Sequence, residues 1–252
     1  MTDTKHTIST VPYISYEAMD EYAETIVHNF SPETIASPTV LDVERFVEIY
    51  LALVVEYKSI VSDKPILAMT AFNKGVVYVS EPHGQQHPIL INAGSMIVDA
   101  KLLTKRNLAR RRFTVMHEAS HWILHRKFFE NVPAKTANTF KNQHLAVKED
   151  SVSYSCSVSE QSDIKTMERQ ADYLAAAMLM PKTTLRMAVR DFFAGLNEFP
   201  RKICRGSSER EDNLAIQLTE YVAKKFRVSK SAALIRLEKL DEIVGKPYWR
   251  CF

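Results

Sequence analysis

The sequence predicts an α+β protein in which a short antiparallel β-sheet packs on helices and a helix pair ends the chain. Two amphipathic helical patterns open the chain, strand patterns bounded by turn residues follow, and long helical patterns fill most of the remainder. Apolar residues three and four apart indicate helices, whereas short β-branched runs between turns indicate strands. We expect an N-terminal helical segment at 1–60, a core at 61–195 and a C-terminal helical region at 196–252.

The elements of the first half follow from these patterns. Asn73-Lys74-Gly75 is typical of a hairpin turn, so the strands on either side of it are expected to pair. The expected elements are helices at 16–29 and 41–58 and strands at 66–72, 76–79 and 89–92.

The second half is predicted to be helical apart from two polar stretches. Residues 130–163 are rich in polar side chains and show little periodicity, which indicates a long loop inserted into the core. Residues 196–212 contain Gly and Pro and indicate a connector. The expected helices span 102–128, 164–180, 183–193, 213–226 and 230–244.

Composition places the chain among ordinary globular proteins. Of 252 residues, 46% are hydrophobic and 25% are charged, and the net charge of +3 is too small to demand a nucleic-acid partner. Three scattered cysteines without a C-x-x-C pair favour a reducing compartment. The polar N-terminus and the lack of an apolar run of about 20 residues predict a cytoplasmic protein without a membrane partner.

The helical pattern over 102–128 contains the motif H-E-x-x-H, formed by His117, Glu118 and His121. Residues four apart share one face of a helix, so both imidazoles can bind one zinc ion. Glu118 projects beside the ion, where its carboxylate can take a proton from a metal-activated water. A helix with two half-buried, hydrogen-bonded histidines is the alternative explanation.

A catalytic zinc site needs a third protein ligand and a position open to water. A third histidine at the spacing of the metzincin motif is excluded, because its two defining positions hold Leu124 and Lys127. Glu168, on the next predicted helix, is the candidate, with Asp172 one turn further on. We expect Asp172 to accept a hydrogen bond from the outer N–H of a ligand histidine. An exposed acidic face is the common explanation for such a pair in isolation.

The segments RRFTVMHEASHWILH and ERQADYLAAAMLMP resemble the ImmA/IrrE family of metallopeptidases. That family shows a basic-Phe-Thr lead-in, an H-E-x-x-H helix with a further histidine, and a second, acidic helix ending in Met-Pro. The matching positions are Arg112, Phe113, Thr114, His117, Glu118, His121, His125, Glu168, Ala171, Asp172, Tyr173, Ala175, Ala176, Leu179, Met180 and Pro181.

The resemblance covers about 85–181 and, more weakly, the last helix pair. It implies a small zincin-like core with Zn²⁺ on His117, His121 and Glu168. It also implies an intracellular peptidase with a narrow protein substrate, usually a helix-turn-helix repressor. His125, Tyr154 and Tyr173 are candidates for contacting the substrate or the oxyanion.

The last two predicted helices have the spacing of a helix-turn-helix, with Ser229 as N-cap of the second. Lys224, Lys225, Arg227, Lys230 and Arg236 are expected to be exposed. Acidic residues offset these cations, so we expect core packing or protein recognition and no sequence-specific DNA binding.

Three functions remain open on the sequence alone. The leading one is zinc-dependent cleavage of a specific protein. The alternatives are a DNA-binding regulator with a peptidase-like sensor domain and a zinc-binding protein without turnover. The intact Glu118 argues against the last of these.

Overall fold

The computed structural model describes residues 11–61, 66–81, 84–131 and 158–245 of the chain. Short helices open this part, and Ser15 caps the first of them by accepting a hydrogen bond from the Ala18 N–H at 3.2 Å. Their bounds are α1 (Tyr16–Phe30), α2 (Pro32–Ala36), α3 (Val43–Arg45) and the π-helical turn η1 (Phe46–Tyr50).

The helix expected over 41–58 is wrong in its second half. Helical structure ends at Tyr50, and Ala52 has a φ of 53°, a left-handed conformation that a helix cannot continue through. The following residues form β1 (Val54–Ile60). β-Branched and aromatic side chains favour a strand here, although their spacing also fits a helix.

Five strands form a mixed sheet in the order β2-β5-β1-β3-β4. β1 and β5 are parallel, and the other neighbours are antiparallel. The α+β class is therefore confirmed. The antiparallel sheet expected from the sequence did not include β1 and β5, and the parallel pair that they form makes the observed sheet mixed. The remaining bounds are β2 (Ala68–Thr70), β3 (Gly75–Ser80), β4 (Gln86–Ile91) and β5 (Ser95–Asp99).

The expected hairpin around Asn73-Lys74-Gly75 does not form. β2 pairs with β5, with Met69 opposite Ile97, and β3 pairs instead with β4. The turn residues only redirect the chain, because the partner of each strand is decided by long-range packing. β2 and β4 are the two edges of the sheet within the described residues.

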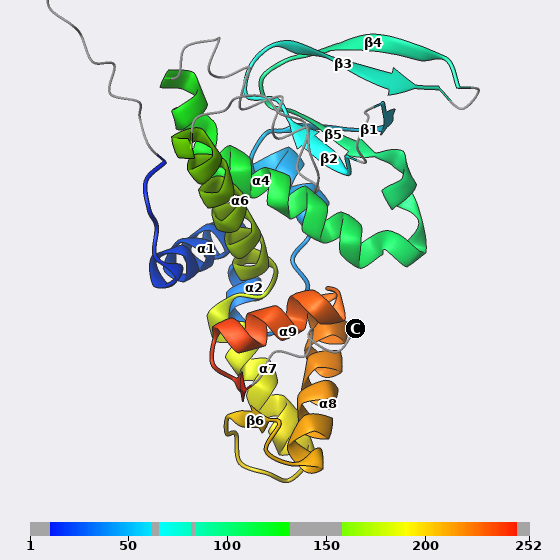
Figure 1. The fold of residues 1–252 in the computed structure, drawn as a ribbon. Coiled ribbons are helices and arrows are strands. Elements are labelled where there is room, and N and C mark those ends of the chain that lie inside the picture. The colour runs from blue at the N-terminus through cyan, green and yellow to red at the C-terminus, as the bar shows by residue number, and fades with distance from the viewer. Residues whose placement is uncertain (1–10, 62–65, 82–83, 132–157, 246–252) are drawn as a thin grey trace, which may run out of the picture.

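Two long helices, α4 (Leu108–Asn131) and α6 (Val158–Leu179), cross beside the sheet (Figure 1). The 3₁₀ turns η2 (Ala100–Leu103) and η3 (Lys105–Asn107) lead into α4. Because α6 begins at Val158, the end of the predicted 130–163 loop is helical, and residues 132–157 lie outside the described part.

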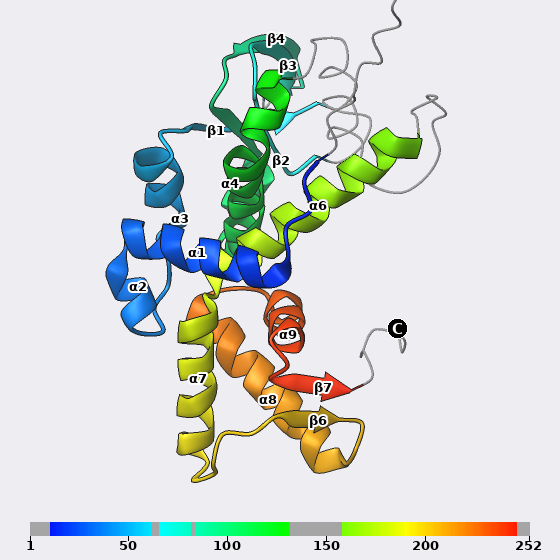
Figure 2. The same ribbon diagram turned by 90° about the vertical axis from the view of Figure 1, so that its left-hand side faces the viewer.

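The C-terminal part lies on the other side of α1 from the sheet (Figure 2). The predicted 196–212 connector contains a strand, and the helix expected to reach residue 244 ends at Lys239, shortly before Asp241 with its φ of 58°. The elements are α7 (Lys182–Gly195), β6 (Ile203–Arg205), α8 (Glu209–Phe226), α9 (Lys230–Lys239) and β7 (Ile243–Gly245), with β6 parallel to β7.

One large apolar core includes buried side chains from α1, α4, α6, α7, α8 and α9. The division into regions at 1–60, 61–195 and 196–252 stays a prediction. Across the described residues, none of the helices combines the length and hydrophobicity that a bilayer crossing requires.

Arg236 corrects the expected exposed face of α9, because its side chain is only 1% exposed. Its Nη2 lies 2.6 Å from Asp20 Oδ1 on α1, and its Nε donates to the Met180 carbonyl at 3.2 Å. Asp20 also accepts a hydrogen bond from the Tyr173 hydroxyl at 3.0 Å. These buried contacts join α9, α1 and α6.

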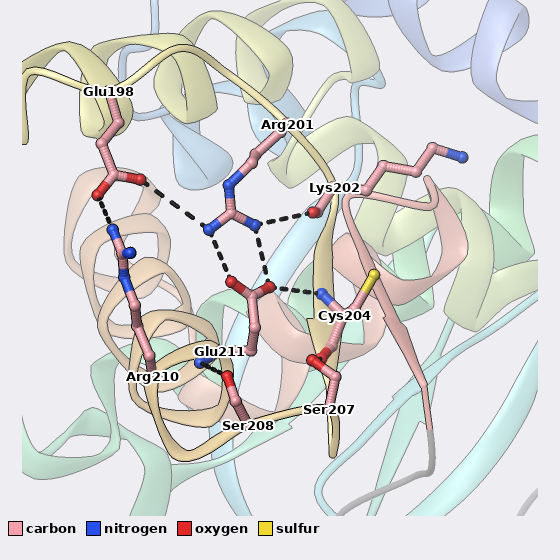
Figure 3. Close-up of polar contacts among 8 residues, drawn as sticks. All are labelled: Glu198, Arg201, Lys202, Cys204, Ser207, Ser208, Arg210 and Glu211. Carbon is pink, nitrogen blue, oxygen red and sulfur yellow. Dashed lines mark hydrogen bonds and ion pairs between the residues drawn. The ribbon is translucent and has the colours of Figure 1, made fainter.

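An exposed polar cluster holds the segment before α8 (Figure 3). Arg201 contacts both carboxylate oxygens of Glu211, at 3.0 and 2.6 Å, and Glu211 also accepts the Cys204 N–H at 2.8 Å. The hydrogen bond from Arg201 is the main cause that lowers the pKa of Glu211, followed by that from Cys204. Arg210 donates to Glu198 at 2.6 Å.

Candidate metal centre

The crossing of α4 and α6 brings together the three sequence-predicted ligands. The Nε2 atoms of His117 and His121 are 3.0 Å apart. One Glu168 oxygen lies 3.3 Å from His117 Nε2 and the other lies 3.4 Å from His121 Nε2. All three ligand atoms lie within 4.8 Å of one another, so one ion can contact them together. The geometry therefore places the expected ligands as a candidate metal-binding group.

His117 faces the outside of this group. Its Nδ1 lies 2.8 Å from Asp172 Oδ1, the contact expected from the sequence. Burial lowers the pKa of His117, but the hydrogen bonds to Asp172 and Glu168 and the charge of Glu118 outweigh it and raise that pKa to about 10. The surroundings of the imidazole therefore favour a positive charge.

His121 is held from the inside by a chain of hydrogen bonds. Its Nδ1 lies 3.0 Å from His125 Nδ1, and His125 Nε2 lies 3.0 Å from Gln170 Oε1. Gln170 Nε2 in turn donates to the Pro12 carbonyl at 2.7 Å. His121, His125 and Gln170 are all at least 98% buried.

This chain fixes the protonation of each ring, because a carbonyl oxygen can only accept. Pro12 therefore requires the amide nitrogen of Gln170 to face it, which leaves Oε1 to accept from His125 Nε2–H. His125 Nδ1 is then an acceptor, so His121 donates from Nδ1 and keeps a lone pair on Nε2. Asp172 fixes His117 in the same tautomer.

The two tautomers aim two nitrogen lone pairs and a carboxylate at one point. With His117 neutral, three acceptors this close repel one another unless a cation lies between them; without a cation, the raised pKa of His117 keeps a proton on its Nε2 instead. Two imidazoles and a glutamate also form the donor set that Zn²⁺ takes in catalytic sites that keep a position open to water. The residues present therefore fit a bound metal ion.

The other predicted site residues differ in their placement. Glu118 is partly buried and follows His117 directly on α4. His125, considered as a substrate contact, is 2% exposed and points inward to His121 and Gln170, which favours a positioning role. Tyr154 lies outside the described residues.

Tyr173 is also turned away from the metal-binding group. Its hydroxyl donates to Asp20, its ring stacks on Tyr16 at 4.3 Å between centroids, and Arg236 lies over it at 5.3 Å. Burial raises the pKa of Tyr173 to about 12, so the hydroxyl stays protonated at neutral pH. These contacts indicate a structural link between helices.

A pocket of about 890 Å³ opens beside the metal-binding group. It is lined by α4, α6 and α9, and Asp172 belongs both to its wall and to the hydrogen bond with His117. Thr114, one turn before His117 on α4, is a further lining residue. The pocket therefore adjoins the candidate ligands through Asp172, and none of the three ligands lines it.

Sequence reasoning missed Gln170 and Pro12 as parts of this centre. Gln170 lies two positions from both Glu168 and Asp172, off the helix face that those two share. Its contact with Pro12 spans 158 positions of the chain. Only the crossing of α4 and α6 and the path of the N-terminal segment create this contact, so no local pattern signals it.

A comparison with known protein families gives a match over part of the chain. Residues 157–238 match the sequence profile of the IrrE N-terminal-like domain, a peptidase family. The match includes Glu168 and Asp172 and continues into α9, whereas His117 and His121 precede it. A search of curated proteins gives no significant match. The segment 157–238, which the fold brings against the H-E-x-x-H helix, is therefore similar to the IrrE N-terminal-like domain of a peptidase family.

Proposed function

We propose that the protein is a zinc-dependent endopeptidase. The observation that carries this proposal is the convergence of the two Nε2 atoms and the Glu168 carboxylate beside Glu118, in a chain that contains a peptidase-family domain. His117 is partly exposed and His121 is buried, so the group opens to solvent on one side only. A substrate would approach from the His117 side.

The chain supplies a base and a positioned ligand set. A zinc ion in this group would supply Lewis-acid activation of a water molecule and of the scissile carbonyl. Glu118 is proposed to take the proton of that water and to pass it to the leaving amine. Asp172 and the His125–Gln170 chain keep the two imidazoles in the tautomer that presents Nε2.

The free edge of β2 offers a place for an extended substrate. The carbonyl of Leu67 accepts from the Asp99 N–H, and both backbone groups of Ala71 bond toward residues 94 and 95. Backbone groups alternate in direction along an antiparallel strand, so those of Ala68 and Thr70 point away from β5. Among the described residues no strand pairs with this edge, which suits a peptide that adds as a further strand.

The substrate class rests on the resemblance to ImmA/IrrE peptidases. We propose that the substrate is a helix-turn-helix repressor and that cleavage takes place in the cytoplasm. The alternative of a DNA-binding regulator is disfavoured because Arg236 of α9 is buried and bound to Asp20, and Lys230 pairs with Glu220. Fewer cations then remain on the helix pair for phosphate contacts.

The proposal is tested by comparing cells that express the wild-type protein with cells that express Glu118→Gln. Glutamine keeps the shape of the side chain but cannot take a proton, so we expect a loss of activity of about 10²–10⁴-fold with zinc retained. Labelling of new protein N-termini should find cleavage inside a helix-turn-helix protein only with the wild type. Identical sets of N-termini in both cultures would overturn the proposal.

A further inference from the structure

We propose that the pocket beside the metal-binding group binds an acidic segment of the protein substrate that also carries apolar side chains. This inference rests on the proposed peptidase function and adds to it a specificity-determining surface. The surface is formed by α4, α6 and α9 and is called the α9 pocket below.

The floor of the α9 pocket is apolar. Ile235 is 50% exposed and faces the pocket from α9. Exposed branched side chains in a concave surface gain free energy when a partner covers them. Further apolar residues of the lining are Leu67, Phe113, Ala176 and Ala232. A volume of about 890 Å³ lies in the range of pockets that bind small molecules, so it accommodates several peptide side chains.

The rim of the α9 pocket is cationic. Arg110, Arg169 and Lys239 are exposed and come from α4, α6 and α9 respectively. Arg169 lies 6.0 Å from the ring of Tyr13, and Lys239 lies 4.6 Å from the ring of Tyr16. Within the described part of the chain none of the three cations forms an ion pair.

Negative charge in the lining does not balance these cations. Asp172 is the acidic residue among those that line the pocket, and its carboxylate is bound to His117. Arg236 is already paired with Asp20. Three unpaired cations around an apolar floor therefore favour a ligand that brings carboxylates together with apolar side chains.

A peptide fits this chemistry better than a nucleic acid. Duplex DNA is read by a helix that projects into a groove, whereas Ala232 and Ile235 of α9 and its N-cap Ser229 line a concavity shared with two other helices. The pocket also adjoins the His117 side of the metal-binding group through Asp172. A substrate segment in the pocket would therefore hold the adjoining peptide near the candidate ligands.

The test measures binding in the Glu118→Gln protein, so that it does not depend on turnover. The probes are two pools of fluorescein-labelled decapeptides, one built from leucine, phenylalanine, aspartate and glutamate, the other with lysine in place of the acidic residues. A labelled DNA duplex is the third probe. Fluorescence anisotropy gives each Kd, and elemental analysis and circular dichroism establish that every variant keeps its zinc and its helix content.

The variants reverse rim charges from two different helices. We expect the double variant Arg110→Glu, Lys239→Glu to weaken binding of the acidic pool by at least about tenfold, and Ile235→Asp to weaken it by a similar factor. Arg190→Glu reverses an exposed cation on α7 that does not line the pocket, and it should change the Kd by less than about twofold.

The outcomes separate this inference from the peptidase proposal. Selective binding of the acidic pool that the rim variants remove supports the inference, even if the wild-type protein cleaves nothing. Equal binding of both peptide pools, tighter binding of the duplex, or rim variants that behave like Arg190→Glu would each overturn it. In those cases, specific cleavage by the wild type would leave the proposed function standing.

Discussion

His117 and His121 have the same proposed role as metal ligands, but an exposed carboxylate orients the first and buried side chains orient the second. His117 is oriented at the surface by Asp172, a single carboxylate whose side chain is 61% exposed. His121 is oriented in the interior by neutral groups, His125 and Gln170. The exposed partner brings charge to the imidazole, whereas the buried partners bring fixed geometry and depend on the packing around them.

The same contrast occurs away from the metal-binding group. Arg236 and Asp20 are buried and join α9 to α1. Arg201 contacts both carboxylate oxygens of Glu211, in the first turn of α8, and this pair lies nearer the surface, with side chains 41% and 14% exposed. A buried charge that loses its partner stays away from water, whereas an exposed charge is resolvated. Burial therefore decides how strongly each contact couples to the stability of the fold.

The largest expected effect is loss of the metal from either histidine variant. His117→Ala and His121→Ala should each reduce bound zinc from about one ion per chain to almost none, because two protein ligands rarely hold a catalytic zinc. Elemental analysis measures this. His28→Ala, on the exposed face of α1, is the control and should keep its zinc. Full retention of zinc in His121→Ala would remove that residue from the ligand set.

The second prediction concerns the buried ion pair. Asp20→Asn leaves the charge of Arg236 buried without a counter-charge, so the free energy of unfolding should fall by about 3–5 kcal/mol. Urea denaturation measures this change. The double variant Asp20→Asn, Arg236→Met should recover part of it, because the uncompensated charge is then absent. A change below about 1 kcal/mol in Asp20→Asn would show that the pair is solvated.

The third prediction compares the two supports of the histidines directly. Gln170→Ala and Asp172→Ala should each weaken zinc binding by about 10–100-fold. Gln170→Ala should also lower the free energy of unfolding, by about 1–3 kcal/mol and by more than Asp172→Ala, because the Pro12 carbonyl and the His125 N–H lose their buried partner. Competition with a zinc chelator and urea denaturation measure the two effects. Equal stability losses would break the distinction between the two sides.

The smallest expected effect is at the exposed cluster of Figure 3. Arg201→Met should cost at most about 1 kcal/mol at neutral pH. Since the folded state lowers the pKa of Glu211, the pair stabilises the fold above the unfolded-state pKa of about 4.3, and this contribution is lost as the pH falls through the folded value. Thermal unfolding of parent and variant should therefore converge once the pH falls below the folded-state pKa of Glu211. A gap that persists in acid would point to packing of the Arg201 side chain.

The sequence was most informative where one helix determines the geometry. His117 and His121 are four residues apart, so helix periodicity alone places both rings on one face. Glu168 required a second helix, and the acidic pair with Asp172 pointed to it. Each of these residues lies in a long helix that the sequence predicts, so local preference and final structure agree there.

The pairing of strands and the second support of the metal-binding group could not be predicted. β1 pairs in parallel with β5, so residues 54–60 contact residues 95–99, which are far away in the sequence. Tyr173 was expected near the substrate, but the buried charges of Asp20 and Arg236 draw its hydroxyl the other way. Strand pairing and the direction of the Tyr173 hydroxyl depend on contacts between distant segments, and the periodicity of a sequence does not predict such contacts.

The contact of Gln170 with Pro12 has a consequence for the synthesis of the protein on the ribosome. The two residues are 158 positions apart, so at about 5–20 residues per second the ribosome makes the second some 8–30 s after the first. During that interval the N-terminal segment lacks its partner, and Glu168 is made only just before the interval ends. The nascent chain therefore completes its candidate metal-binding group only when the second long helix leaves the exit tunnel.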